Sequence, residues 1–146
     1  MKNVLFVCVH NAGRSQMAEA FFNRIVEGKA VGFSAGTQIT ETINPVVVEA
    51  MQEVGIDISR EKPKMLTLDM MDRADKVITM GCGVDGICPA SIVPSEDWML
   101  EDPAGKLMET VRKIRDEVKL RVEKLIVEMD IKKELKCEKS PGFDFP

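Results

Sequence analysis

The first 36 residues alternate between an apolar run, a short loop, an amphipathic stretch and a second apolar run, and this alternation constrains the fold most. Residues 3–8 are rich in β-branched and aromatic side chains, which is typical of a buried parallel strand. Residues 15–26 have helical spacing with Ser15 in the N-cap position, and residues 30–36 form a second short strand. Because strand, helix and strand follow in this order, the segment predicts a parallel sheet with a crossover helix.

The rest of the chain continues this alternation. Asn44 and Pro45 open a predicted helix that runs to about residue 54 and ends at Gly55, and Thr67 caps a short helix over 66–73. Strands are predicted over 76–80 and near 91–98, and a long amphipathic helix over roughly 107–129. We therefore expect an α/β fold with three layers, in which helices flank both faces of a four-stranded parallel sheet.

The loop between the first strand and the first helix has the composition of an oxyanion site. Cys8 ends the strand and Arg14 closes the loop, so that backbone N–H groups and a helix dipole face a bound anion. The same field favours a thiolate over a thiol, which makes Cys8 the candidate nucleophile rather than an inert buried cysteine. Arg14 can hold two equatorial oxygens, and the hydroxyl of Ser15 can donate to the thiolate. The predicted oxyanion-binding loop consists of Val9, His10, Asn11, Ala12, Gly13 and Arg14.

Three residues of this loop have separate expected roles. The side chain of Asn11 braces the backbone, because asparagine tolerates left-handed conformations and bonds nearby peptide groups. Gly13 permits a close approach between the backbone and the anion. His10 is the only histidine in the chain, and we interpret it as a solvated loop residue.

The composition limits the partners. A net charge of −4 over 146 residues argues against a nucleic-acid-binding protein. The sequence has neither a signal-peptide pattern nor an apolar run of transmembrane length, so we expect a cytoplasmic protein with no membrane contact. In that compartment, four cysteines more often serve catalysis or redox chemistry than static disulfides. Residues 1–130 are expected to form one catalytic domain, and residues 131–146 the end of the last helix and a flexible tail.

Several motifs together resemble the low-molecular-weight tyrosine phosphatase family. A Cys-x5-Arg-Ser motif follows the first strand, Ser34-Ala-Gly36 lies on the second, and Asp102-Pro103 precedes the last helix. Within that family, residues 14–19, 44–45, 96–98 and 102–105 are similar to arsenate reductases of the thioredoxin-coupled type. The resemblance covers roughly residues 3–124. It implies that Asp102 is the general acid that gives a proton to the leaving oxygen.

The missing tyrosines and two further cysteines bear on the substrate. Phosphatases of this family typically carry tyrosines beside the Asp-Pro pair, whereas this chain has none, which suits a small inorganic oxyanion. The resemblance implies a relay in which Cys8 attacks arsenate, Cys82 attacks the sulfur of Cys8, and arsenite leaves. Cys88 then forms a disulfide with Cys82, and thioredoxin or a similar dithiol reduces it. Five residues separate these two cysteines, one fewer than we expect from the family. Cys137 is interpreted as an exposed bystander.

The resemblance also bears on ions and competing ligands. Some members of the family bind potassium through an asparagine, an acidic residue and a serine, and Asn11, Glu19 and Ser34 match those positions. Oxygen ligands of this kind suit a hard cation. No cofactor is required by the expected chemistry. Phosphate and sulfate are expected to compete with arsenate for the loop.

Two other functions remain open from the sequence. A protein-tyrosine or small-phosphoester phosphatase would use Cys8, Arg14 and Asp102 but would need neither Cys82 nor Cys88. A sensor that holds trivalent arsenic between cysteines is the other reading, and such a protein would need no proton donor at position 102.

Overall fold

A four-stranded parallel sheet forms the centre of the molecule. The computed structural model describes residues 2–80 and 95–131. Within them the strands are β1 (Lys2–Cys8), β2 (Ala30–Gly36), β3 (Lys76–Thr79) and β4 (Ser95–Asp97), in the spatial order β2-β1-β3-β4. All three neighbouring pairs are parallel. The predicted sheet is therefore confirmed, and its carboxyl edge holds the end of β1.

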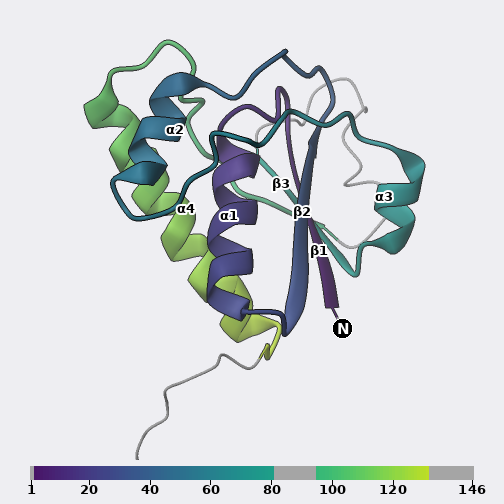
Figure 1. Cartoon of the computed structure of the whole chain (residues 1–146). Helices are drawn as coiled ribbons and strands as arrows, with labels where there is room; N and C mark the ends of the chain where they lie inside the picture. Colours follow the sequence, from purple (N-terminus) through teal and green to yellow (C-terminus); the bar gives the residue numbers. More distant parts are fainter. Residues whose placement is uncertain (1, 81–94, 132–146) are drawn as a thin grey trace, which may run out of the picture.

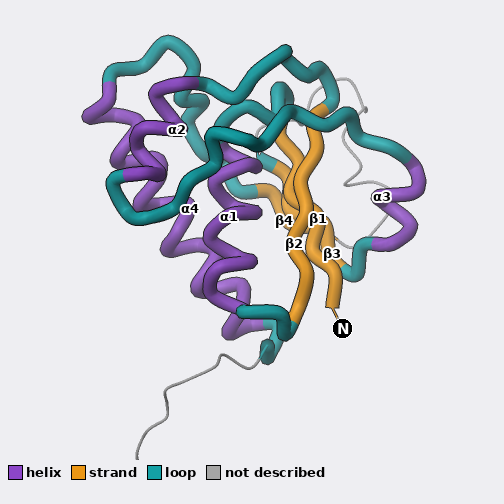
Figure 2. Tube along the Cα trace, in the orientation of Figure 1, coloured by secondary structure: helices purple, strands orange, loops and turns teal. Residues whose placement is uncertain are grey.

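Helices cover both faces of the sheet and complete three layers. Figure 1 shows α1 (Arg14–Val26), α2 (Pro45–Gln52) and α4 (Met108–Glu128) on one face, and α3 (Leu68–Arg73) on the other. The strands lie between these helix layers in Figure 2. None of the helices in the described residues combines the length and the apolar character needed to cross a membrane.

The central strand β1 divides the hydrophobic core into two parts. Because side chains alternate along a strand, Val4, Phe6 and Cys8 face the cluster that contains α1, α2 and α4, while Leu5 and Val7 face the cluster of α3. These five side chains are at most 2% exposed. Burial of each large apolar side chain contributes roughly 1.5–3 kcal/mol to folding. Cys8, at the end of β1, thus belongs to the larger of the two hydrophobic clusters.

Local signals in the sequence set several helix ends. The side chain of Asn44 accepts a hydrogen bond from the backbone N–H of Val46, and the hydroxyl of Thr67 accepts one from Met70, as predicted. The assignment of Ser15 as an N-cap is wrong. Helix α1 begins at Arg14, and its N-cap residue Gly13 makes no side-chain capping bond. The hydroxyl of Ser15 instead contacts Cys8, so the first turn leaves its N–H groups for the loop.

A partly exposed ion-pair cluster joins the C-terminal end of α2 to α4. Both carboxylate oxygens of Glu53 accept hydrogen bonds from Arg112, at 2.9 Å from Nε and 2.7 Å from Nη2. Arg115 donates to Glu53 Oε1 and to the carbonyl of Ala50, each at 2.9 Å. Hydrogen bonding to Arg112 lowers the pKa of Glu53 from 4.5 to about 2. The ionised carboxylate therefore stabilises the packing of these two helices.

Replacing Glu53 by glutamine is expected to lower the free energy of unfolding most at neutral pH. Because the pKa of Glu53 is lower in the folded chain, its contribution is fully present above pH 4.5 and disappears as the pH falls to about 2. Urea unfolding of both proteins at several pH values between 7 and 2 measures the difference. Glu128→Gln, an exposed change on α4, is the control. A difference that does not shrink below pH 4.5 would contradict this assignment.

Candidate active site

The loop between β1 and α1 surrounds the sulfur of Cys8 with hydrogen-bond donors. Cys8 is the last residue of β1 and is 2% exposed. Its Sγ lies 2.8 Å from the hydroxyl of Ser15, and the backbone N–H of Asn11 donates to the same sulfur at 3.3 Å. A thiolate at this position would be stabilised by both groups and by the N-terminus of α1.

Asn11 fixes the direction of the Ser15 hydroxyl. Its backbone adopts a left-handed conformation with φ = 53°, and its side chain is fully buried. Because Asn11 Nδ2 donates to Ser15 Oγ at 2.7 Å, the serine proton is free to point at Cys8. Asn11 Oδ1 accepts two further hydrogen bonds, from Gln16 Nε2 at 3.0 Å and from the backbone N–H of Lys64 at 2.8 Å. The expected bracing role of Asn11 is therefore visible as a network.

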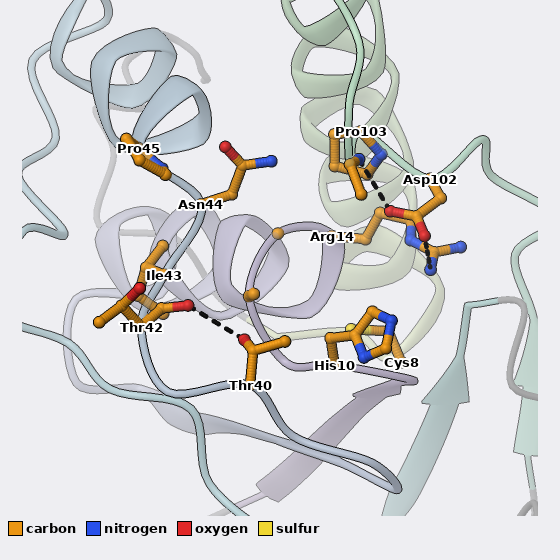
Figure 3. A pocket seen from close by; sticks show the side chains of 13 residues that line it. Cys8, His10, Arg14, Thr40, Thr42, Ile43, Asn44, Pro45, Asp102 and Pro103 are labelled. Carbon is orange, nitrogen blue, oxygen red and sulfur yellow. Dashed lines mark hydrogen bonds and ion pairs between the residues drawn. The ribbon is translucent and has the colours of Figure 1, made fainter.

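The guanidinium group of Arg14 lies at the mouth of the loop, and its Nε donor makes no hydrogen bond to the described residues. The side chain is about 6% exposed, and Nη1 donates to the carbonyl of Leu100 at 3.1 Å. Nη2 lies 3.8 Å from Asp102 Oδ2 (Figure 3). Arg14 Nε is buried and has no hydrogen-bond partner among the described residues. A buried donor without a partner costs about 1–3 kcal/mol, so the site is built to receive an acceptor such as an oxyanion.

Asp102 stands at the entrance of the same cavity. Its side chain is 49% exposed, and Oδ1 accepts a hydrogen bond from the backbone N–H of Ala104 at 3.0 Å. Oδ2 is the oxygen that faces Arg14. Figure 3 shows this carboxylate next to the Arg14 guanidinium, at the end of the cavity that also holds Cys8 and His10. A carboxyl group placed there can exchange protons with solvent and reach a leaving oxygen.

Two glycines let other segments press against the loop. A Cβ on Gly36 would lie 2.7 Å from the carbonyl oxygen of Val9 and 2.9 Å from the backbone nitrogen of Asn11. A Cβ on Gly13 would lie 2.8 Å from Pro103 Cγ. The end of β2 and the turn after Asp102 therefore approach the loop more closely than any larger residue would allow.

The cavity over the loop has room for more than an oxyanion. Its volume is about 210 Å³, several times the roughly 30 Å³ that one water occupies in the liquid. The lining residues come from the loop, from the segment before α2 and from the turn after β4: Cys8, His10, Ala12, Gly13, Arg14, Thr40, Thr42, Ile43, Asn44, Pro45, Asp102, Pro103 and Ala104. No phenylalanine, tyrosine or tryptophan is among these described residues.

His10 lies in the loop and is partly exposed, and its ring also contacts the backbone of another segment. The side chain is half-buried, and Nδ1 lies 2.8 Å from the carbonyl oxygen of Gln38. Since a carbonyl can only accept, Nδ1 carries a proton and donates this hydrogen bond. The sequence also gave no indication of Leu100 or Lys64, which contact the loop across 86 and 53 positions. Gln16 could have been found, because a glutamine at a core position of a helix needs a polar partner.

The three positions that match a potassium site lie near one another but are already engaged. The hydroxyl of Ser34 donates to Glu19 Oε1 at 2.5 Å, and Lys64 Nζ lies 3.5 Å from the same oxygen. Both acceptor positions of Asn11 Oδ1 are used by N–H groups. In this arrangement the residues do not fit a potassium ion. Among the other expected site residues, Cys82, Cys88 and also Cys137 lie outside the described residues.

A comparison with family profiles decides the family. The profile described as "Low molecular weight phosphotyrosine protein phosphatase" matches residues 3–139. The chain belongs to this family. Its Cys8–Ser15 loop and its Asp102 turn are thus parts of a fold shared by low-molecular-weight phosphatases and their relatives, as the resemblance implied.

Individual relatives within the family are arsenate reductases. The chain is 40% identical over 126 residues to an arsenate reductase of Staphylococcus aureus, which covers 84% of this chain and 95% of the relative. It is 41% identical over 132 residues to a "Glutaredoxin arsenate reductase" of Synechocystis, covering 88% and 99%. A solved thioredoxin-dependent arsenate reductase of Corynebacterium glutamicum superposes with a TM-score of 0.76 at 37% identity, over 89% of this chain and 62% of that one.

Proposed function

We propose that this protein reduces arsenate to arsenite by means of a cysteine nucleophile. The lining of the cavity over Cys8 carries the proposal, because it holds no phenylalanine, tyrosine or tryptophan among the residues that the structure describes. Among the described lining residues a phosphotyrosine ring would find only the His10 imidazole as an aromatic neighbour, whereas a small oxyanion needs only the loop N–H groups, the unused Nε of Arg14 and a proton donor. The identity of about 40% to arsenate reductases supports the same substrate.

The described residues account for the first step. The Cys8 thiolate attacks arsenic, a sulfur–arsenic bond forms, and one oxygen leaves as water after Asp102 gives it a proton. Arg14 holds equatorial oxygens through two parallel N–H groups and gains a partner for Nε. The Ser15 hydroxyl, 2.8 Å from Cys8 Sγ, stabilises the sulfur as an anion before attack. Arsenic is still pentavalent in this adduct.

Reduction requires a second sulfur, for which we propose Cys82. Its thiolate attacks the sulfur of Cys8, a disulfide forms, and the electron pair of the sulfur–arsenic bond goes to arsenic, which leaves as arsenite. Cys88 then displaces Cys8 from Cys82, and a Cys82–Cys88 disulfide remains. A dithiol protein reduces that disulfide and is itself oxidised. Because every step starts from a free thiol, we propose that the protein acts in the reducing cytoplasm.

We propose thioredoxin as the reductant. The solved relative from Corynebacterium glutamicum is described as thioredoxin-dependent, which supports this choice. The relative from Synechocystis is named for glutaredoxin instead. Oxidation of NADPH that depends on arsenate, measured in parallel with thioredoxin plus its reductase and with glutaredoxin plus glutathione, separates the two reductants.

Cysteine variants test the relay in the same assay. Cys82→Ser is expected to form the adduct and release no arsenite, whereas Cys88→Ser releases one equivalent of arsenite and then stops. Cys137→Ser serves as the control and turns over like the unchanged protein. Multiple turnovers by Cys88→Ser would contradict the relay.

Hydrolysis of phosphoesters is the second candidate, because the family includes phosphatases. It needs Cys8, Arg14 and Asp102 alone, so it would survive the loss of Cys82 and Cys88. A kcat/KM for an aryl phosphate far above that for arsenate would favour it over reduction.

A further inference from the structure

The ammonium group of Lys64 lies against a half-enclosed carboxylate at the back of the loop. Lys64 Nζ is 3.5 Å from Glu19 Oε1, and the two side chains are 35% and 19% exposed. The same oxygen accepts the 2.5 Å hydrogen bond from Ser34, which is fully buried on β2. Glu19 thus has a hydroxyl and an ammonium group as partners.

The backbone of Lys64 is held on both sides. Its N–H donates to Asn11 Oδ1 at 2.8 Å, and its carbonyl accepts from the backbone N–H of Gly36 at 2.8 Å. Leu66 continues this pairing by donating to the carbonyl of Gly36 at 2.9 Å. Because both peptide groups are fixed, the lysine side chain leaves the backbone at a defined point beside the loop and has only its own rotamers to order.

The contacts of Glu19 and Asn11 leave no place for a free cation such as potassium. Asn11 Oδ1 has no acceptor position left, and Glu19 Oε1 already faces a positive charge. A potassium ion at the same place would meet the ammonium group of Lys64 and be repelled by it. We propose that Lys64 is a built-in cation, which balances Glu19 and positions the oxyanion loop so that no potassium ion is needed.

Lys64 connects to the reacting sulfur through three hydrogen bonds. The path runs from the Lys64 backbone to Asn11, from Asn11 to the hydroxyl of Ser15 and from there to Cys8 Sγ. The positive charge also offsets Glu19, which would otherwise present an uncompensated carboxylate to an incoming anion. Lys64 touches neither the cavity lining nor the substrate position, so it is a positioning residue.

The experiment compares cations at equal ionic strength. Thermal unfolding midpoints and binding of inorganic phosphate are measured in potassium chloride and in tetramethylammonium chloride. The unchanged protein is expected to give the same values in both salts. Lys64→Met should lower the midpoint by about 3–6 °C and weaken phosphate binding about threefold to tenfold. Potassium should restore part of both losses, because removal of the ammonium group leaves the Glu19 carboxylate and the Ser34 hydroxyl open to the ion even though Asn11 Oδ1 stays engaged, whereas tetramethylammonium is too large.

Two further variants make the test specific. Lys64→Arg keeps the charge and should behave like the unchanged protein in both salts. Lys62→Met removes an equal charge from an exposed side chain two positions away and should change neither measurement by a comparable amount. If Lys64→Met does not fold, the comparison of the two salts on the unchanged protein and on Lys64→Arg still shows whether potassium has a specific effect.

A midpoint or phosphate affinity of the unchanged protein that rises specifically with potassium would overturn the proposal. Identical behaviour of Lys64→Met and the unchanged protein in both salts would also overturn it. Neither measurement involves arsenate turnover, so failure of the proposed reaction and failure of this inference give different results.

Discussion

Replacement of Cys8 by serine is expected to abolish arsenate turnover, a loss of at least about 10⁴-fold, while the protein stays folded. The change swaps sulfur for oxygen in a side chain that is 2% exposed and sits 2.8 Å from Ser15. A serine hydroxyl there is not ionised at neutral pH, and its oxygen cannot form the disulfide that releases arsenite. The hydrogen-bonded loop can accept the smaller atom without a backbone shift.

Phosphate binding separates loss of chemistry from loss of structure. Since phosphate is held by Arg14 and the loop N–H groups, Cys8→Ser should bind it within about threefold of the unchanged protein, as followed by isothermal titration. Cys137→Ser is the matched control for the change of residue type and should retain full turnover. Measurable multiple turnover by Cys8→Ser would remove Cys8 from the mechanism.

Replacement of Arg14 by lysine is expected to lower kcat/KM for arsenate by about 10²–10⁴-fold, which corresponds to roughly 3–5 kcal/mol. The variant keeps the charge and loses the planar fork. Arg14 spans from the carbonyl of Leu100 to Asp102 while Nε stays free for a ligand, and a lysine ammonium group cannot satisfy these three directions together. Two parallel bonds to equatorial oxygens become one.

The pattern of the loss tests this geometry. Both kcat and phosphate affinity should fall, because the fork acts in the bound state and more strongly in the transition state. Arg121→Lys, which changes a partly exposed arginine on α4 paired with Glu117, is the matched control and should have activity within twofold of the unchanged protein. If Arg14→Lys kept kcat/KM within threefold, charge alone would explain the role of residue 14.

Elements with a clear periodicity were predictable from the sequence. The strand predicted over residues 3–8 is observed as β1, where Val4–Cys8 form an unbroken buried apolar run of the kind that a central parallel strand needs. Asn44 and Thr67 correctly predicted helix starts, because each side chain accepts a hydrogen bond from a backbone N–H only two or three residues later in the sequence. Ser15 is also a residue type that favours the N-cap position, but the N-cap of α1 is Gly13. Its hydroxyl had a stronger partner in Cys8, seven positions back in the chain, which a local rule does not weigh.

Contacts between distant segments were not predictable. Nothing near Arg14 in the sequence points to the carbonyl of Leu100, and nothing near Asn11 points to Lys64. These partners arise because β1 and β2 bring the loop to one edge of the sheet, where other connections also pass. A backbone carbonyl and a backbone N–H carry no residue signature. The sequence was therefore enough to predict the oxyanion-binding loop, whereas the contacts that support the loop could be found only from the three-dimensional structure.

The position of Cys8 at the end of the central strand limits which thiols can contact its sulfur. Neighbouring strands hold its backbone, with Thr37 donating to the carbonyl of Cys8 at 3.3 Å and Met80 to that of Val7 at 2.8 Å. Because Cys8 is 2% exposed and its backbone is held in this way, we expect that a folded reductant cannot contact its sulfur directly. In the relay proposed above, a second thiol of the same chain therefore has to reach Cys8 first, and the protein that supplies the electrons acts on a disulfide farther from the loop.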